Sequence, residues 1–282
     1  MNSKKHKITK MSGEEDYFDE LKLINSLERS GASDEAIHYI VRNIKNELFD
    51  GITTKDIYKK AFQLLKKTSR PTAARYKLKK AILELGPTGY NFEKFISKLM
   101  QYQGFTVQVG IILEGHCVSH EIDVLAKKDN QVYIIECKFH SIQSRKCDIK
   151  IPLYIKSRFE DVKKAKMKYR AEKDETYKGW IITNTRFTSD AIQYGNCSGL
   201  SLVSWDSPRG SSLRERIDVS GLYPITSLTS LTKREKQLLL EANVILVIDL
   251  CDNPDLLKSI DLKNSKRNSV LKEANELCRR VI

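Results

Sequence analysis

The 282-residue sequence lacks the features that mark a secreted, membrane-spanning or zinc-binding protein. It has six cysteines and five histidines, but no Cys-x-x-Cys pair, and the two residue types do not cluster, so a zinc site is not expected. No apolar run approaches the length of a membrane span, and residues 1–7 lack the apolar stretch of a signal peptide. We therefore expect a cytoplasmic protein with free thiols and no membrane contact.

Acidic residues are scarce relative to basic ones. The chain has 36 Asp and Glu against 49 Lys and Arg, a net charge of +13. Between residues 141 and 170, ten basic residues face three acidic ones, so this stretch alone carries +7. Such a surface favours contact with nucleic-acid phosphates, of RNA as well as DNA. A solvated helix face is the alternative for the lysines at 163–168. The expected DNA contacts are Lys156, Arg158, Lys163 and Lys164.

The strongest motif is a predicted β-hairpin. Residues 120–124 and 134–138 are typical of strands, and residues 127–130 of a tight turn. Because side chains alternate along a strand, Glu136 and Lys138 should share one face. Cross-strand neighbours have Cβ atoms roughly 5 Å apart, so Asp123 should lie beside Glu136. Glu121 should point to the opposite face from Asp123, and Cys137 into the core.

Two carboxylates and a lysine on one face are costly to place without a purpose. They suit hydrolysis of a phosphodiester bond, in which Asp123 and Glu136 hold Mg²⁺ or Mn²⁺. Lys138 would stabilise the transition state. Glu93, from a preceding helix, would bind a second ion or orient a water. The alternative is a buried salt-bridge cluster in an inactive fold.

The hydrophobic share of 40% supports real cores, and the length allows more than one domain. Apolar spacing and helix-capping residues predict a mostly helical region over residues 1–88, ended by the breaker Gly86–Gly89. Residues 89–210 read α-β-β-β-α-β-α-β, a mixed sheet with helices on both faces. Residues 211–282 form a small helical region, similar to a helix-hairpin or SAM-like module. The expected fold class is multidomain α and α/β.

The first region resembles the ATP-cone, a small nucleotide-sensing domain of ribonucleotide reductases. The matching segments are Ile8-Thr9-Lys10, Phe18-Asp19-x-x-Lys22, Phe49-Asp50-Gly51-Ile52-Thr53-Thr54 and Ala73-Ala74-Arg75-Tyr76. The resemblance implies ATP or dATP as a regulatory ligand, with Ile8 and Lys10 against it, Lys22 at its phosphates and Thr54 adding a hydroxyl contact. Met11 stands where the family has a second basic residue, so one contact is missing. A helical scaffold that binds no nucleotide is the alternative.

The second region resembles the Mrr-like branch of the restriction-endonuclease-like superfamily. The matching segments are Phe92-Glu93, Gly104-Phe105, Ile122-Asp123-Val124, Glu136-Cys137-Lys138 and Thr183-Asn184-x-x-Phe187. Many Mrr-like proteins have glutamine in place of Glu136, but glutamate is usual in the wider superfamily. The resemblance implies a DNA endonuclease whose catalytic residues are Glu93, Asp123, Glu136 and Lys138.

Three functions stay open from the sequence. The first is a metal-dependent DNA endonuclease tuned by ATP or dATP, acting in defence against foreign DNA. The second is a nucleotide-responsive DNA-binding regulator without catalysis. The third is a structure-specific nuclease of DNA repair. For a nuclease we expect a homodimer, because one active site cuts one strand at a time.

Overall fold

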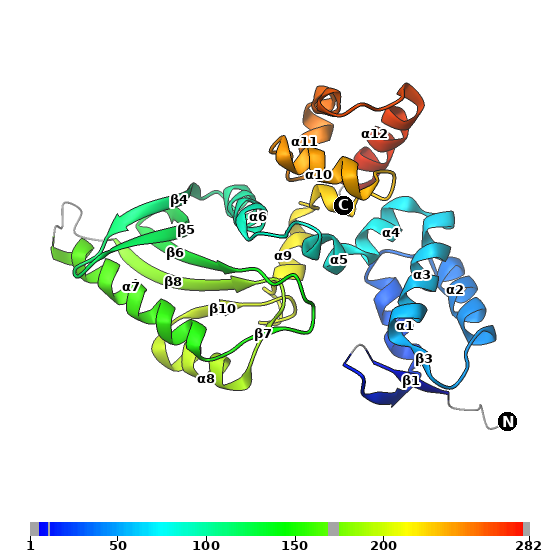
Figure 1. The fold of residues 1–282 in the computed structure, drawn as a ribbon, viewed down its shortest axis with the longest axis horizontal. Coiled ribbons are helices and arrows are strands. Elements are labelled where there is room, and N and C mark those ends of the chain that lie inside the picture. The colour runs from blue at the N-terminus through cyan, green and yellow to red at the C-terminus, as the bar shows by residue number, and fades with distance from the viewer. Residues whose placement is uncertain (1–5, 11, 169–174, 279–282) are drawn as a thin grey trace. The chain divides into compact units, whose positions relative to one another are not determined.

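The computed structural model describes residues 6–10, 12–168 and 175–278. The chain forms two compact units (Figure 1): residues 1–81 together with 225–282, and residues 82–224. The N-terminal and C-terminal regions thus fold into one unit. The hydroxyl of Thr226 donates to the carbonyl of Ala81 at 2.6 Å, and Arg70 donates to Ser269 at 2.7 Å.

The N-terminal part of the first unit joins a small sheet to a set of helices. The sheet has the order β2-β1-β3. The strands are β1 (Lys7–Thr9), β2 (Glu15–Tyr17) and β3 (Ile52–Thr53). The helices are α1 (Glu20–Glu28), α2 (Asp34–Asn46), α3 (Thr54–Thr68), α4 (Arg70–Tyr76) and α5 (Leu78–Leu83). The sequence predicts one helix from about residue 72 to 85, whereas the structure has two, α4 and α5.

Local sequence explains where these helices begin. The side chains of Ser33 and Thr53 accept hydrogen bonds from the first turns of α2 and α3, which satisfies backbone N–H groups that lack an intrahelical partner. The buried face of α2 is apolar, whereas Leu21 of α1 is 68% exposed. The apolar residues buried on α2 are Ile37, Ile40, Val41 and Ile44.

The C-terminal part of the first unit is helical, as expected. Thr232 caps α10 through a capping box with Glu235, and the apolar run 244–250 leads into α11. The elements are η1 (Ile225–Ser227), α10 (Lys233–Glu241), α11 (Val247–Asp252), η2 (Pro254–Ser259) and α12 (Asn264–Cys278).

The second unit is built on a mixed five-stranded sheet of order β10-β8-β6-β5-β4. The three strands of the meander β4-β5-β6 pair antiparallel, and β8 and β10 add in parallel. The strands are β4 (Thr106–Glu114), β5 (Ser119–Lys128), β6 (Gln131–Lys138), β8 (Thr176–Thr183) and β10 (Ser201–Val203). The sequence did not predict the short parallel pair β7 (Lys146–Cys147) and β9 (Arg186–Phe187).

Four helices accompany this sheet. They are α6 (Tyr90–Tyr102), α7 (Lys150–Lys168), α8 (Ser189–Ser198) and α9 (Leu213–Ser220). One apolar cluster joins Ile134 and Ile181 of the sheet to Ile155 and Phe159 of α7 and Ala191 of α8. Helix α6 packs against β4, β5 and β6 and buries Phe92 and Phe95. The sequence predicts a long basic helix from about residue 153 to 172; α7 is described to Lys168, and the last four residues of that prediction lie outside the described residues.

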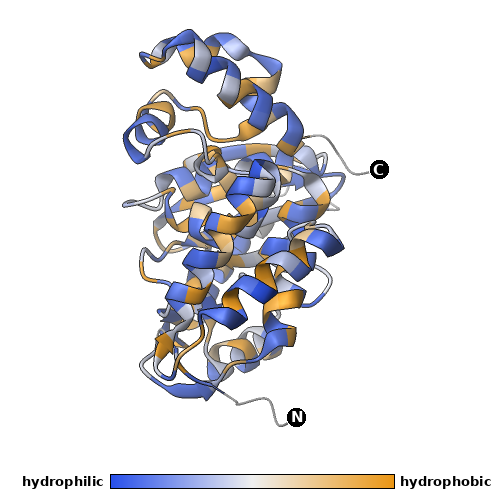
Figure 2. Ribbon diagram, turned by 90° about the vertical axis from the view of Figure 1, so that its right-hand side faces the viewer, coloured by the Kyte–Doolittle hydropathy of each residue, from blue (hydrophilic) through white to orange (hydrophobic). Residues whose placement is uncertain are grey.

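Each helix visible in Figure 2 mixes apolar and polar residues, as expected of helices that bury one face. Among the described residues no helix is both long and apolar enough to cross a membrane. All six cysteines are free, and Cys137 is buried as predicted.

Candidate nuclease site

The site forms where two paired strands separate. β5 and β6 pair from Lys128↔Gln131 up to Val124↔Ile135. The next positions in that register are Asp123 and Glu136, where the pairing stops. The carboxylate of Asp123 accepts a hydrogen bond from the backbone N–H of Cys137 at 2.7 Å. A side chain thus replaces the ladder partner, and Asp123 is brought beside the Glu136–Lys138 segment, as the sequence predicts.

Glu136 is buried and held by two cations. Its side chain is 8% exposed, with one oxygen 2.5 Å from Lys138 Nζ and the other 2.9 Å from Arg158 Nη1. Arg158, on α7, also donates to the carbonyl of Glu121. Both oxygens of Glu136 are therefore engaged by positive charge. The sequence predicted Arg158 as a DNA contact and gave no sign of this pairing.

Carboxylates crowd the site enough to change one another's protonation. Burial raises the pKa of Glu93 to about 7, with further contributions from the charges of Asp123, Glu121 and Glu136. Burial and the charge of Glu136 likewise raise the pKa of Asp123 to about 6. Burial lowers the pKa of Lys138, but its hydrogen bond to Glu136 and the charges of Glu136 and Asp123 together outweigh this, and the net shift is upward. The four predicted catalytic residues are thus electrostatically coupled.

Two glycines give Glu93 its place. Glu93 lies in the first turn of α6, whose N-cap is Gly89, and the Asn91 side chain donates to the Leu85 carbonyl at 2.9 Å. A Cβ on Gly86 would overlap the ring of Phe139, and one on Gly89 would lie 3.2 Å from Glu93 Oε1. The missing side chains let the start of α6 approach the segment that follows Lys138.

Strand alternation did not predict that Glu121 lies close enough to act on the pKa of Glu93. Its charge helps to raise the pKa of Glu93. Strict alternation would separate Ile122 from Leu125, yet both lie in the same apolar cluster. Gly110 sits between the pairs Val109↔Val124 and Ile111↔Ile122, across from Asp123, and has φ +62°. The alternation of side chains between the two faces of β5 is therefore interrupted beside Asp123. Gly110, a glycine within a strand, was the sequence feature that could have indicated this interruption.

Buried polar side chains from the end of β8 fix the segment around Lys138. Thr183 Oγ1 donates to the Lys138 carbonyl at 2.7 Å. The Asn184 side chain accepts from the His140 N–H and donates to the His140 carbonyl, both at 2.8 Å. Thr183 and Asn184 are at most 1% exposed. Both belong to the sequence motif that resembles Mrr-like enzymes, although the sequence gave them no role.

The donor set fits a magnesium-type ion. Over the described ranges 6–10, 12–168 and 175–278, no three His, Cys, Asp or Glu residues form a metal-binding group. Mg²⁺, however, is commonly held by one or two carboxylates with water completing its shell. Asp123 and Glu136 supply that pair. A divalent cation would favour the ionised forms of Asp123 and Glu93, whose pKa values are raised by burial and, to a smaller extent, by neighbouring carboxylates.

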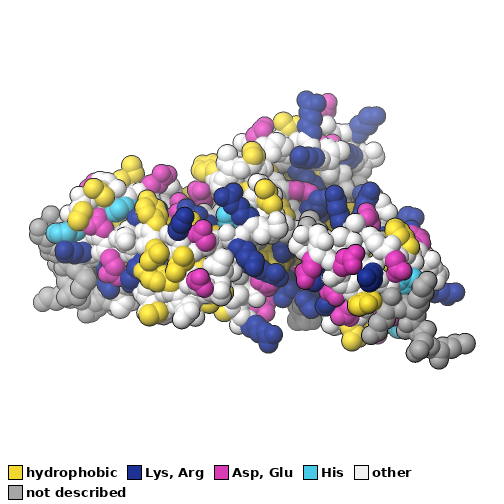
Figure 3. Space-filling view, turned by 60° about the horizontal axis from the view of Figure 1, so that its bottom comes forward, with side chains coloured by type: hydrophobic (Ala, Val, Ile, Leu, Met, Phe, Trp, Pro, Cys, Tyr) yellow, Lys and Arg dark blue, Asp and Glu magenta, His cyan; other side chains and the backbone are white. Residues whose placement is uncertain are grey.

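The remaining predicted DNA contacts are dispersed along α7. Lys156 donates to the Ser198 carbonyl at 2.7 Å and pairs with Glu160. Lys163 and Lys164 line a hollow of about 550 Å³. On the face shown in Figure 3, Lys and Arg side chains lie among Asp and Glu rather than in one continuous patch. Because Lys156 is engaged within the protein, Lys163 and Lys164 are better candidates than Lys156 for phosphate contact.

His120 pairs with a carboxylate of α7. Its Nε2 lies 2.9 Å from Asp161 Oδ2, and Asp161 also accepts from the N–H groups of Cys117 and Val118. The His120 hydrogen bond, with those from Cys117 and Val118, holds the pKa of Asp161 well below its usual range. The tip of the β4-β5 hairpin is thereby tied to α7.

The predicted nucleotide contacts lie around the small sheet. Ile8 is buried and pairs with Ile52, and Thr54 is the first residue of α3. Lys10 pairs with Asp16 at 3.0 Å and Lys22 with Asp19 at 3.6 Å. Met11 lies outside the described residues, so its missing contact stays a prediction.

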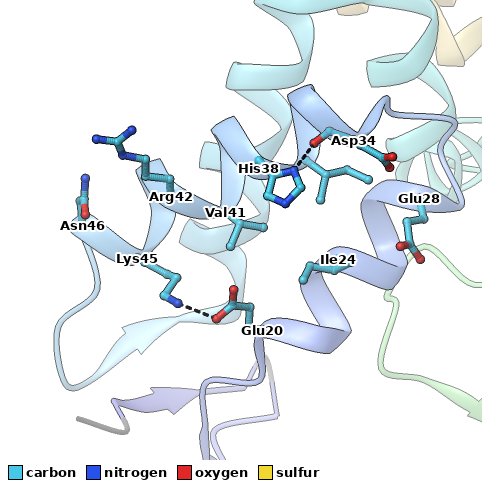
Figure 4. A pocket seen from close by; sticks show the side chains of 10 residues that line it. Glu20, Ile24, Glu28, Asp34, His38, Val41, Arg42, Lys45 and Asn46 are labelled. Atoms are coloured by element: carbon cyan, nitrogen blue, oxygen red, sulfur yellow. Dashed lines mark hydrogen bonds and ion pairs between the residues drawn. The ribbon is translucent and has the colours of Figure 1, made fainter. Parts of the chain in front are cut away.

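A separate groove of about 500 Å³ lies between α1 and α2 (Figure 4). None of the four predicted nucleotide contacts lines it. Its apolar floor is Ile24, Ile37 and Val41, and the Lys45–Glu20 ion pair spans its rim at 2.7 Å.

Comparison with known proteins identifies two regions of the chain. Residues 86–207 match the family model described as restriction endonuclease, and residues 223–278 match the model described as AF1548-like, C-terminal. The first match suggests a nuclease and agrees with the mixed sheet of the second unit. It also covers all four predicted catalytic residues.

Two relatives each cover about two thirds of this chain, and neither has an assigned function. An uncharacterised protein of Archaeoglobus fulgidus is 33% identical over 183 residues, which cover 64% of this chain and 99% of that protein. The crystal structure of AF1548, a protein of unknown function, is 31% identical with a TM-score of 0.55 and covers 68% of this chain and 98% of its own.

The restriction endonuclease MspJI, solved in complex with a 27-mer oligonucleotide, gives a TM-score of 0.28 at 10% identity, covering 61% of this chain and 38% of its own. A TM-score this low does not show a shared fold. The near-complete coverage of the two uncharacterised relatives shows the family: the chain belongs to the AF1548-like proteins, with a restriction-endonuclease-like domain at residues 86–207.

Proposed function

We propose that this protein is a metal-dependent DNA endonuclease whose active site is formed by Glu93, Asp123, Glu136 and Lys138. The observation that carries the proposal is the placement of Asp123, Glu136 and Lys138 together where β5 and β6 separate, with Glu93 close enough for their charges to act on it. Two of the carboxyl groups have pKa values raised to about 6 and about 7. Strongly shifted carboxyl groups beside a lysine are typical of catalytic sites.

Asp123 and Glu136 would hold Mg²⁺ or Mn²⁺, which supplies Lewis-acid chemistry to the scissile phosphate. The N–H of Cys137 orients the Asp123 carboxylate. Lys138 stays protonated and presents its charge where negative charge develops on the phosphate. Glu93, with a pKa of about 7, exchanges a proton readily near neutral pH and is suited to accept one from the attacking water.

Cleavage of supercoiled plasmid tests the proposal. Wild type should nick or linearise DNA with Mg²⁺ or Mn²⁺ and not with EDTA, and Lys138→Ala should be inactive. Protein that shifts DNA on a gel yet cleaves neither plain nor modified DNA nor RNA would instead favour a non-catalytic, nucleotide-responsive DNA-binding regulator.

Regulation by ATP or dATP belongs to the same proposal. It is supported by the arrangement of Ile8 beside Ile52 in the paired strands β1 and β3, with Thr54 directly after β3 at the start of α3. A hydroxyl at a helix N-terminus is well placed to meet a phosphate. Lys10 and Lys22 would exchange their exposed acidic partners for the nucleotide, a small cost because such surface ion pairs contribute little. A role in defence against foreign DNA, as opposed to repair, and a homodimer complete the proposal.

A further inference from the structure

We propose that Arg158 makes metal binding depend on DNA binding. In the free protein its guanidinium holds Glu136, one of the two metal ligands of the proposed function on which this inference rests. A DNA phosphate would take the guanidinium over and release Glu136 to the ion. Metal and DNA would then bind cooperatively.

The contacts of Arg158 place it in competition with a metal ion. Nη1 donates to Glu136 Oε2 at 2.9 Å, while Lys138 holds Oε1 at 2.5 Å. Nη2 is occupied by the carbonyl of Glu121. An ion that binds Glu136 through Oε2 has to displace the guanidinium. The pair is costly to break without a substitute, since the side chains of Glu136 and Arg158 are only 8% and 14% exposed.

A phosphate is the substitute that the chemistry favours. The planar guanidinium offers parallel N–H groups that match a phosphate in two hydrogen bonds. Arg158 also has a route to the surface, because its guanidinium carbon lies 5.5 Å from the ring centroid of Tyr154, a residue 61% exposed. It stands on α7 within the basic stretch of residues 141–170.

Thermodynamic linkage determines whether DNA raises or lowers the affinity for the metal ion. If DNA removes Arg158 from Glu136, DNA tightens metal binding, and metal must tighten DNA binding by the same factor. Removing the guanidinium by mutation should imitate the first step. Arg158→Gln should bind metal more tightly than wild type without DNA, and the cooperativity should disappear.

The test measures Mn²⁺ affinity of the DNA-free protein by electron paramagnetic resonance. Wild type is compared with Arg158→Gln and with Lys178→Gln, which removes one charge from β8 in the same unit. We expect about tenfold tighter binding for Arg158→Gln, within the usual range of coupling between sites, and no change for Lys178→Gln. Arg158→Lys keeps the charge but not the fork that spans Glu136 and Glu121, and should fall between the two.

A second readout is duplex affinity by fluorescence anisotropy with Ca²⁺ or EDTA. Ca²⁺ should tighten DNA binding of wild type and have little effect on Arg158→Gln. Equal Mn²⁺ affinities in wild type and Arg158→Gln would overturn the role of Arg158 while leaving the nuclease intact. Mn²⁺ binding unchanged by Glu136→Gln, with no plasmid cleavage by wild type, would instead overturn the proposed function itself.

Discussion

The Asp123 carboxylate accepts the backbone N–H of Cys137 at 2.7 Å, at the place where β5 and β6 stop pairing. This one bond links β5, which continues alongside β4, to β6, which continues alongside β8. It orients an acidic side chain at the split and sets it next to Glu136 and Lys138. The proposed chemistry depends on this local end of the pairing between β5 and β6.

Glu93 should make stability depend on pH. Its folded-state pKa of about 7 lies above the usual carboxyl value, so between the two the folded protein binds the proton more tightly and stability falls as pH rises. Without metal, Glu93→Gln should therefore raise Tm by a few degrees at pH 8 and by much less at pH 5. Glu241→Gln, at an exposed position of α10, is the control. An equal effect of Glu93→Gln at both pH values would contradict the shifted pKa.

The hydroxyl of Thr183 should position Lys138. Thr183→Val keeps the shape but leaves the Lys138 carbonyl without this donor, which costs roughly 1–3 kcal/mol when the group is buried. We expect a lower Tm and slower cleavage for Thr183→Val. Thr183→Ser keeps the hydroxyl and should restore both. If the Ser and Val variants cleave at the same rate, the hydrogen bond has no part in positioning the lysine.

Gly86 should tolerate no side chain. A Cβ there would overlap the Phe139 ring, so Gly86→Ala should cost about 1–3 kcal/mol, as overpacking does. Phe139→Leu should relieve part of that cost in the double variant, measured by urea unfolding as a double-mutant cycle. Additive effects of the two substitutions would show that the glycine and the ring do not constrain each other.

ATP should stabilise the first unit. At a concentration one hundred times its Kd, a ligand that binds only the folded state adds about 2.7 kcal/mol, visible as a rise in Tm. Lys10→Ala should reduce this rise. Lys7→Ala, three residues earlier in β1 and paired with Glu15, serves as the matched control and should keep it. No rise with ATP or dATP would favour a scaffold that binds no nucleotide.

Sequence patterns predicted the succession of the main helices and strands along the second unit and the close placement of Asp123, Glu136 and Lys138, because alternation and the tight turn are local signals. They did not predict the pairing of Arg158 with Glu136, which joins a helix to a strand 22 residues earlier. Nor did they give Glu121 a place near Glu93, since that depends on a change of facing opposite Gly110. Contacts of this kind depend on how helices settle on the sheet, and no short-range pattern encodes them.

The most direct test of the central claim is the rate at which Asp123→Asn nicks supercoiled plasmid with saturating Mn²⁺, next to wild type. Asparagine keeps the shape and one oxygen acceptor for the Cys137 N–H but removes the charge that would hold the ion. We expect metal-dependent nicking by wild type and a loss of at least about a thousandfold, roughly 4 kcal/mol of transition-state stabilisation, in a variant with an unchanged circular dichroism spectrum. Nicking at the wild-type rate by Asp123→Asn would show that the cluster around Asp123 is not a nuclease site.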